Sequence, residues 1–209
     1  MVIVFANQKG GCGKTTTCMQ FANYLASVKH IENLLVLDVD FQGSFHDRRE
    51  DDLKSFPDND VLYDVMRVDP EEVPEIIRAT NNVEGSMVVI DFPGKVDDDN
   101  LEYVLKSADF IVCPFSYDYN TLESTTIFAL LCEKLTLKAK ILFLPNRIKK
   151  AVNYDTKELT QLAFSKFGVI LPEISDRVAM ERGSTLVLSD DVHSIVKEAF
   201  DVISTEINI

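Results

Sequence analysis

A glycine-rich stretch that carries two lysines, Lys9-Gly-Gly-Cys-Gly-Lys14-Thr-Thr, constrains the fold of this chain more than any other feature. It follows an apolar run of strand length, Val2–Ala6, and leads into apolar residues near helical spacing in Thr15–Val28. Glycines let the backbone wrap its amide groups around phosphate oxygens, and the helix N-terminus that follows attracts the same anions. The sequence therefore predicts a phosphate-binding loop between a first strand and a first helix.

Apolar runs of strand length recur along the chain, continuous as in parallel strands buried on both faces, and alternate with helical patterns. The predicted strands are Val2–Ala6, Leu34–Leu37, Met87–Ile90, Phe110–Pro114 and Ile141–Leu144. The predicted helices are Thr15–Val28, Thr121–Leu135, Tyr154–Phe167 and Val192–Ile207. The polar stretch Phe41–Asn59 is the least regular and is predicted to be a mobile loop. This order predicts one α/β domain over 1–209, a three-layer sandwich in which helices flank a mostly parallel, twisted sheet.

The composition is that of a globular chain. The 209 residues are 46% hydrophobic, enough for one domain with a sizeable core. No apolar run is long enough to cross a bilayer, and the first strand begins at once, so we expect a cytoplasmic protein. The four cysteines lack metal-ligand spacing and are expected to be reduced core residues.

The net charge of −13 is spread unevenly. Residues 38–110 alone carry a net charge of −13, whereas 134–166 contain eight lysines and arginines against two acids. A strongly acidic whole argues against a general nucleic-acid binder, but the basic segment leaves a local basic face possible.

The loop departs from the common P-loop pattern. That pattern begins with a glycine five positions before the Gly-Lys pair, and here Gln8 stands in its place. Lys14 still precedes two hydroxyl residues, Thr15 and Thr16, and is predicted to reach the β- and γ-phosphates. The Thr15 hydroxyl is predicted to ligate Mg²⁺. A glycine-rich turn with incidental lysines is the alternative.

These residues resemble the deviant Walker A motif, Lys-Gly-Gly-x-Gly-Lys-Thr/Ser, of the ParA/MinD family of ATPases, with Cys12 at the variable position. The resemblance implies a P-loop NTPase fold, bound ATP and Mg²⁺, and a homodimer when ATP is bound. In that family the first lysine crosses the dimer interface to phosphates held by the partner, and Lys9 would have this role. The alternative for Lys9 is a solvated loop lysine. The implied nucleotide contacts are Lys9, Gly10, Gly11, Cys12, Gly13, Lys14, Thr15 and Thr16.

A second motif follows the next predicted strand, because Asp38-Val-Asp40-Phe-Gln-Gly-Ser is similar to the family pattern Asp-x-Asp-x-Gln-Gly-Ser/Asn. Acids at the carboxyl ends of parallel strands face the ligand crevice. The resemblance implies that Asp40 orients or activates the attacking water, while Asp38 supports Mg²⁺ or Lys14. Phe41 stands where ParA proteins usually carry proline. Ordinary capping of strand ends is the alternative for both acids.

A third motif, Met87-Val-Val-Ile-Asp91-Phe-Pro-Gly94, has the hydrophobic run and terminal acid of a Walker B strand. We expect Asp91 to bind Mg²⁺ through water. The stretch Gly94–Asn100 would then be the switch that senses the γ-phosphate, and its three successive acids favour a solvated helix start over a metal site.

The run Ile141–Leu144 leads to Asn146 and Arg147, where family members often place an asparagine that reads the adenine edge. An amide side chain can donate to N7 and accept from the N6 amine of adenine. We therefore expect Asn146 and Arg147 to contact the nucleotide, with a turn residue as the alternative for Asn146. The segment Ile174–Gly183 loosely resembles the loop that closes the base pocket in the family.

The resemblance implies a switch in DNA partitioning, with slow hydrolysis stimulated by a partner protein. The final helix carries one lysine and several acids, so we expect no membrane binding. Nonspecific DNA binding would use basic residues, with a solvated charged surface as the alternative. The candidates are Lys138, Lys140, Lys149, Lys150 and Lys157, with Arg147 beside them. The other hypothesis is a nucleotide-dependent scaffold that positions a protein and never touches DNA.

Overall fold

The computed structural model describes residues 1–94, 99–135 and 137–209. Within these ranges, seven strands form one sheet in the order β3-β2-β4-β1-β5-β6-β7, and every pairing is parallel. The strands are β1 (Val2–Phe5), β2 (Leu34–Asp38), β3 (Asp64–Arg67), β4 (Met87–Asp91), β5 (Phe110–Phe115), β6 (Lys140–Pro145) and β7 (Gly168–Ile170). This confirms the predicted α/β fold with a parallel sheet.

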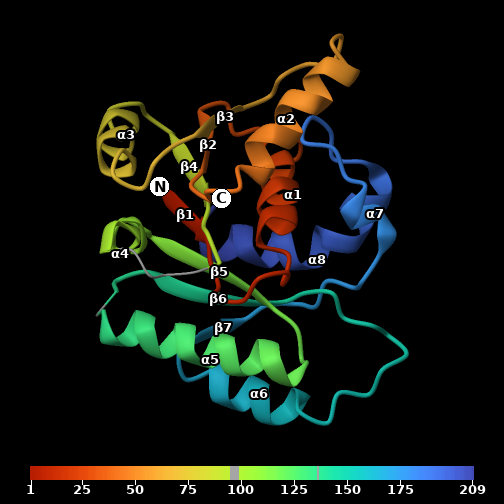
Figure 1. Cartoon of the computed structure of the whole chain (residues 1–209). Coiled ribbons are helices and arrows are strands. Elements are labelled where there is room, and N and C mark those ends of the chain that lie inside the picture. The colour runs from red at the N-terminus through yellow and green to blue at the C-terminus, as the bar shows by residue number, and fades with distance from the viewer. Residues whose placement is uncertain (95–98, 136) are drawn as a thin grey trace.

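Helices cover both faces of the sheet (Figure 1). One face carries α1 (Lys14–Ser27), α2 (Ser44–Ser55), α7 (Val178–Glu181) and α8 (Asp190–Glu206). The other carries α3 (Val73–Thr80), α4 (Asp99–Lys106), α5 (Tyr119–Lys134) and α6 (Lys157–Phe164). Among the described helices, none combines the length and the apolar composition needed to span a bilayer.

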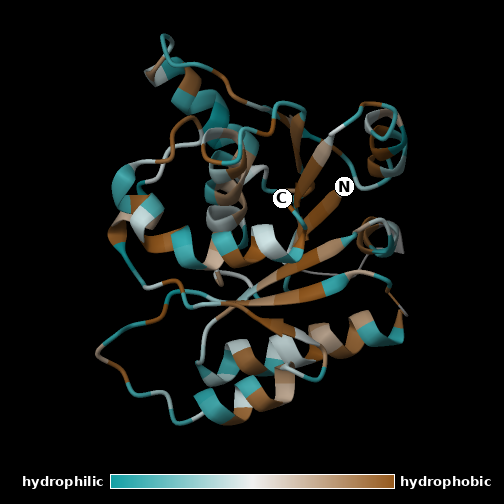
Figure 2. Ribbon diagram, turned by 180° about the vertical axis from the view of Figure 1, so that it is seen from behind, coloured by the Kyte–Doolittle hydropathy of each residue, from teal (hydrophilic) through white to brown (hydrophobic). Residues whose placement is uncertain are grey.

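Two hydrophobic cores lie on either side of the sheet, because successive side chains of a strand point to opposite faces. In β1, Ile3 and Phe5 pack with α1 and α8, whereas Val2 and Val4 pack in the core under α3 to α6. Figure 2 shows the central strands as mostly hydrophobic ribbons and the helices as mixed. All four cysteines are free and buried, as expected for core residues.

The five predicted strands are present, each within one residue at either end. The four predicted helices are present as α1, α5, α6 and α8, although α6 is shorter than predicted. The short edge strands β3 and β7 were not predicted, nor were α3 and α4.

The prediction of a mobile loop over Phe41–Asn59 was wrong, since Ser44–Ser55 forms the twelve-residue helix α2. Its sequence is almost entirely polar, so it has no apolar stripe from which a helix could be predicted. Instead, two buried side chains, Phe45 and Arg49, anchor it to the body of the protein. The Asp38 carboxylate accepts hydrogen bonds from its first backbone amides, of Phe45 and His46, at 3.0 and 2.9 Å. Tertiary contacts, not helical periodicity, therefore specify this helix.

Candidate functional site

The glycine-rich loop lies where predicted, between the end of β1 and the start of α1. Gly11 and Gly13 have φ angles of 77° and 91°, which disfavour any residue with a side chain. Lys14 begins the helix and is buried, and its Nζ donates to the Lys9 carbonyl oxygen at 3.1 Å. The loop is therefore already folded back on itself, with its lysine held inside the curve.

A cavity of about 820 Å³ opens in front of this loop. The loop forms one wall, Asp40, Phe41 and Gln42 form another, and Pro93 and Gly94 a third. These walls meet because β2, β4 and β1 are neighbours in the sheet and end together, with Asp38 in register with Asp91. The phosphate loop and the two acidic motifs, which lie far apart in sequence, thus surround one cavity at the carboxyl edge of the sheet.

Asp91 is fully buried at the end of β4, and neither carboxylate oxygen has a hydrogen-bond partner among the described residues. Burial raises the pKa of this carboxyl to about 8. The Thr15 hydroxyl opposes the rise without reaching hydrogen-bond geometry, and the charge of Asp38 adds to it. The charge of Lys14 also opposes the rise, but a buried carboxylate without hydrogen-bond donors is costly, so this position lacks donors that a ligand would supply.

Asp38 is also buried, but its oxygens are well occupied. One accepts from the amide of Asp40 at 3.2 Å, and the other accepts from the first amides of α2. Burial raises the pKa of the Asp38 carboxyl, while these three donors lower it. Asp38 therefore fixes the turn that carries Asp40 and also caps α2, a helix that the sequence did not predict. Whether it also supports Mg²⁺ or Lys14 stays a prediction.

Asp40 is partly exposed and lines the cavity opposite Lys14 and Thr15. Its carboxylate accepts from the Gln42 amide at 3.0 Å, and its carbonyl oxygen accepts from the Gly43 amide at 2.8 Å. These bonds close a tight turn, so the carboxylate is held in place at the cavity wall.

Lys9 lines a second cleft, of about 500 Å³, on the other side of the phosphate loop. Asp118, at the start of α5, lines it too. Burial would raise the pKa of Asp118, but hydrogen bonds from Ser116 and Thr121 and the charge of Lys9 hold it below its usual range. The two lysines of the motif thus serve different spaces: Lys14 faces the first cavity and Lys9 the second.

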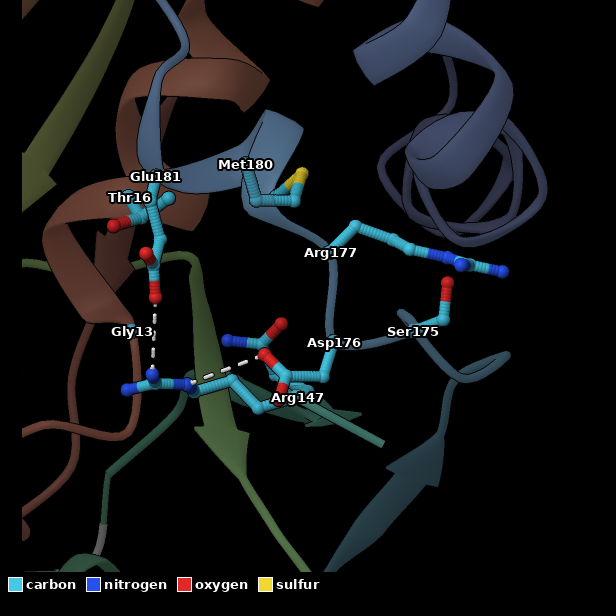
Figure 3. Close-up of a pocket in the computed structure, with 9 residues that line it drawn as sticks. Gly13, Thr16, Arg147, Ser175, Asp176, Arg177, Met180 and Glu181 are labelled. Carbon is cyan, nitrogen blue, oxygen red and sulfur yellow. Dashed lines mark hydrogen bonds and ion pairs between the residues drawn. The ribbon is translucent and has the colours of Figure 1, made fainter. Parts of the chain in front are cut away.

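Asn146 and Arg147 follow β6 and line a pocket of about 270 Å³ beside the phosphate loop (Figure 3). The Asn146 amide nitrogen donates to the Cys12 carbonyl oxygen at 2.9 Å. Arg147 donates to the Gly11 carbonyl oxygen at 3.0 Å and to a carboxylate oxygen of Glu181 at 3.3 Å. Both residues therefore lie against the phosphate loop, at the edge expected for a base.

The far wall of this pocket comes from the loosely recognised segment Ile174–Gly183. Its contributors are Ser175, Asp176, Arg177, Met180 and Glu181. The Asp176 carboxylate lies 3.8 Å from Nε of Arg147, and Figure 3 shows this ion pair across the pocket. The resemblance of this segment to the base-pocket loop of the family is too loose to assign single residues, so the sequence predicted none of these five.

The structure does not bring the five basic candidates together. Lys140 begins β6, whereas Lys149 and Lys150 follow the opposite end of that strand. Lys140 pairs with Glu206, and Lys157 lies 2.6 Å from Glu173. Lys138 precedes β6 and lies with Lys140 at the amino end of the sheet. Lys149, Lys150 and Lys157 lie at the carboxyl edge of the sheet, where Lys157 is engaged by Glu173 and by the Tyr117 ring.

The predicted γ-phosphate switch, Gly94–Asn100, falls partly on residues 95–98, which lie outside the described residues. Gly94 itself lines the phosphate cavity, close to the Lys14 ammonium: a Cβ at this position would lie 3.3 Å from Nζ. Asp99 begins α4.

The fold and the loop are those of a P-loop NTPase, and comparison with known proteins finds similar chains. Residues 1–102 match a family model described as AAA domain. The "Maintenance of carboxysome distribution protein A" of Gloeobacter kilaueensis is 33% identical over 114 residues, 54% of this chain and 48% of that protein. An uncharacterized protein of Pseudomonas putida is 51% identical over 43 residues, 21% of this chain and 16% of that protein. These matches thus span half or less of the curated relatives' lengths.

Solved structures match nearly the whole fold at low identity. A putative plasmid partition protein from Borrelia burgdorferi, bound to AMPPNP, has a TM-score of 0.74 at 18% identity, covering 98% of each chain. An ATP complex of McdA from Cyanothece has a TM-score of 0.72 at 16% identity, covering 100% of this chain and 96% of that one. A chain of the MinC:MinD cell division protein complex of Aquifex aeolicus has a TM-score of 0.73 at 15% identity, covering 98% of this chain and 96% of that one. The chain therefore shares the fold of the ParA/MinD P-loop ATPases, and its glycine-rich loop is similar to their deviant Walker A motif.

Proposed function

We propose that this chain hydrolyses ATP with Mg²⁺ and works as an ATP-dependent dimeric switch in the partitioning of DNA, such as a plasmid or mobile element. The observation that carries the proposal is the cavity lined by Lys14 and Asp40, which opens at the end of the strand that carries the buried Asp91. A phosphate-binding loop, a partly exposed acid and a buried acid that lacks donors are the parts that phosphoryl transfer to water requires.

The residues fit a Mg²⁺ ion bound with the substrate. The Asp91 oxygens lack donors, and a hydrated cation would provide them, while the Thr15 hydroxyl would be a direct ligand. In the described part of the chain, no three His, Cys, Asp or Glu side chains gather closely enough to hold a metal alone. Such a site suits Mg²⁺, which usually keeps several waters and shares substrate phosphates. When bound, Mg²⁺ neutralises charge on the phosphate oxygens.

The chain's own residues then divide the work. The amides of the phosphate loop hold the phosphates, and Lys14 exchanges its bond to the Lys9 carbonyl for the β- and γ-phosphate oxygens. Asp40, fixed by its tight turn, orients the attacking water. Asn146 and Arg147 support the base side of the site.

Lys9 provides the coupling to dimerisation. Its side chain lines the second cleft rather than the first cavity, so it is not committed to the phosphates of its own chain. In a dimer that joins the two phosphate loops face to face, Lys9 would reach the nucleotide of the second copy. Its charge would then favour the dimer only when that nucleotide is present.

The surface on which the dimer acts has two candidates. Partition on DNA is supported by the likeness to a protein described as a putative plasmid partition protein, and by Lys149 and Lys150 at the nucleotide edge. Positioning of a protein cargo without DNA is favoured by the ion pairs that engage Lys140 and Lys157, and by the net charge of −13. A partner protein would stimulate hydrolysis in either case.

Replacement of Asp40 tests the switch. We expect Asp40→Ala to bind ATP, lose hydrolysis and accumulate as an ATP dimer in light scattering, because the water is no longer oriented. Asp47→Ala, an exposed acid on α2, serves as control and keeps wild-type turnover. An Asp40→Ala chain that stays monomeric with ATP and Mg²⁺ would sink the assigned role.

Salt-dependent retention on nonspecific DNA separates the two outputs. With ATP bound, we expect Lys149→Glu/Lys150→Glu to abolish retention. Each lost phosphate contact lowers the affinity for DNA and reduces its dependence on salt concentration. Lys138→Glu/Lys140→Glu, at the opposite end of β6, is the matched control and should retain DNA. Retention that is absent in the wild type favours the protein-positioning alternative, whereas equal retention in both variants shows that the proposed basic face is wrong.

A further inference from the structure

Phe41, which departs from the proline usual in ParA proteins, is a large apolar side chain left in solvent. It is 64% exposed at the mouth of the phosphate cavity. Its backbone is nevertheless held firmly, because its carbonyl oxygen accepts from Arg67 at 2.7 Å and the Asp40–Gly43 turn closes beside it. A rigid backbone that presents an exposed aromatic ring has the character of an interface anchor, since little entropy is lost when the ring is buried.

The mouth beside Phe41 is open. A Cβ built on Gly10 or Gly11 would meet no atom of the described residues within 4 Å, and both glycines are exposed. Gly10 and Gly11 line both the phosphate cavity and the second cleft, as does Arg147. The two spaces therefore meet at the tip of the phosphate loop. Phe41 lines the first and not the second, so the loop stands between its ring and the cleft of its own chain.

The second cleft has the chemistry that an aromatic ring needs. Val152, 46% exposed, and the ring of Tyr154 supply apolar walls. Lys9 and Lys149 supply cations that favour the face of a π-system, beside the carboxylates of Asp118 and Asp176. Its wall is fixed, because the Lys149 amide donates to the Tyr154 hydroxyl at 3.1 Å and the Tyr154 ring lies 5.5 Å from that of Tyr117. At about 500 Å³, the cleft has room for a ring.

We propose that Phe41 of one copy of this chain enters the second cleft of the other copy in the ATP-bound dimer. This inference rests on the proposed ATP-dependent dimer and adds its contact. A two-fold dimer makes every contact twice, so each Phe41 inserts beside the partner's Lys9. The Phe41 ring of one copy and the Lys9 side chain of the other, which would cross to the phosphates, then lie side by side in the dimer interface. Phe41 itself lines the cavity that the nucleotide would fill, so the anchor and the nucleotide share one wall.

Cysteine cross-linking tests the contact directly. The double variant Phe41→Cys/Val152→Cys is mixed with AMPPNP and Mg²⁺, then treated with copper phenanthroline or a short bis-maleimide. We expect a covalent dimer that needs both cysteines and the nucleotide. The native cysteines are all buried, but Cys12 lines the same cleft, so the single variant Phe41→Cys measures the background from that thiol. Phe41→Cys/Val83→Cys is the matched control, because Val83 is 47% exposed but precedes β4 at the amino end of the sheet.

A variant on the receiving side gives a second measurement. Val152→Asp places a charge in the cleft and should weaken ATP-dependent dimerisation about tenfold or more, with binding of a fluorescent ATP analogue to the monomer unchanged. Leu162→Asp, exposed on α6, should leave the dimer intact. If the wild type forms no dimer with ATP, both the proposed function and this inference fail. If it dimerises but the Val152 pair does not cross-link above the Val83 pair, or Val152→Asp dimerises normally, this inference alone is overturned.

Discussion

The side-chain amide of Asn146 donates to the carbonyl oxygen of Cys12 at 2.9 Å and thereby joins the end of β6 to the middle of the phosphate loop. The two residues are 134 positions apart. A residue expected to read the base is thus also a brace for the loop that holds the phosphates. The brace is tight, because a Cβ on Gly13 would lie only 2.3 Å from the Asn146 amide nitrogen.

We expect Asn146→Ala to weaken binding of inorganic triphosphate as well as ATP. Removal of the donor leaves a buried carbonyl unpaired, which costs about 1–3 kcal/mol and loosens the loop. Titration calorimetry with ATP, GTP and triphosphate separates the two roles of the side chain. If only the preference for ATP over GTP changes, Asn146 reads the base without bracing the loop.

Gly13→Ala should destabilise the protein by about 2 kcal/mol or more. The new methyl group would collide with Asn146, and the φ of 91° is costly for any residue with a Cβ. Gly10→Ala is the matched control, since its Cβ meets no described atom within 4 Å. Urea denaturation compares the two; equal midpoints would contradict the packing at Gly13.

Asp38→Ala should lower the free energy of unfolding by about 1–2 kcal/mol, because the first amides of α2 lose their acceptor. The variant also frees the turn that carries Asp40, so ATP turnover should fall with it. Asp51→Ala, on the same helix but exposed, should change stability by about 0.5 kcal/mol or less. Unfolding curves and steady-state hydrolysis measure both effects, and an Asp38→Ala chain with wild-type stability would refute the capping role.

The stability of the nucleotide-free protein should fall as pH rises from about 4 to about 8. With a pKa raised to about 8, Asp91 keeps its proton in the folded chain, whereas the unfolded chain releases it near the ordinary value of 3.8. The folded state therefore binds more protons in this window, and its stability falls by at most about 1.4 kcal/mol per pH unit from this group. Asp91→Asn should flatten the profile in EDTA. Urea melts at successive pH values measure the slope, and an unchanged slope would refute the assignment.

The phosphate loop and the parallel sheet could be predicted because their signals are local. Glycines, lysines and hydroxyl residues stand together in eight consecutive positions, Lys9–Thr16, and the strands are continuous apolar runs. The acids Asp40 and Asp91 were placed at the carboxyl edge of the sheet by the same logic, since Asp40 follows β2 closely and Asp91 ends β4. The structure brings these motifs to one edge of the sheet, as parallel topology requires.

The features that sequence reasoning missed depend on contacts between distant segments. Helix α2 has no apolar stripe, and Asp38 and the buried Arg49 hold it in place. Met180 and Glu181 line the base pocket only because α7 is folded back beside Thr16. The lysines of 134–166 are neighbours in sequence, but β6 separates Lys140 from Lys149 by its full length. A charge count along the chain cannot reveal such a separation.

The last prediction concerns Arg49, a buried arginine that ties α2 to the segment behind the base pocket. Its guanidinium donates to the carbonyl oxygens of Tyr63 and Thr185, at 2.9 Å each, and lies 4.3 Å from the Tyr63 ring. Arg49→Met keeps the apolar stem but removes both donors. We therefore expect the free energy of unfolding to fall by about 2–3 kcal/mol.

Because Thr185 follows α7 closely, the same change should loosen the base pocket and weaken ATP binding more than triphosphate binding. Lys54→Met, on the same helix with a side chain 71% exposed, is the control and should change stability by about 0.5 kcal/mol or less. Chemical denaturation and calorimetry measure the two effects. If both variants unfold at the same urea concentration, Arg49 does not hold the helix, and the base pocket does not depend on it.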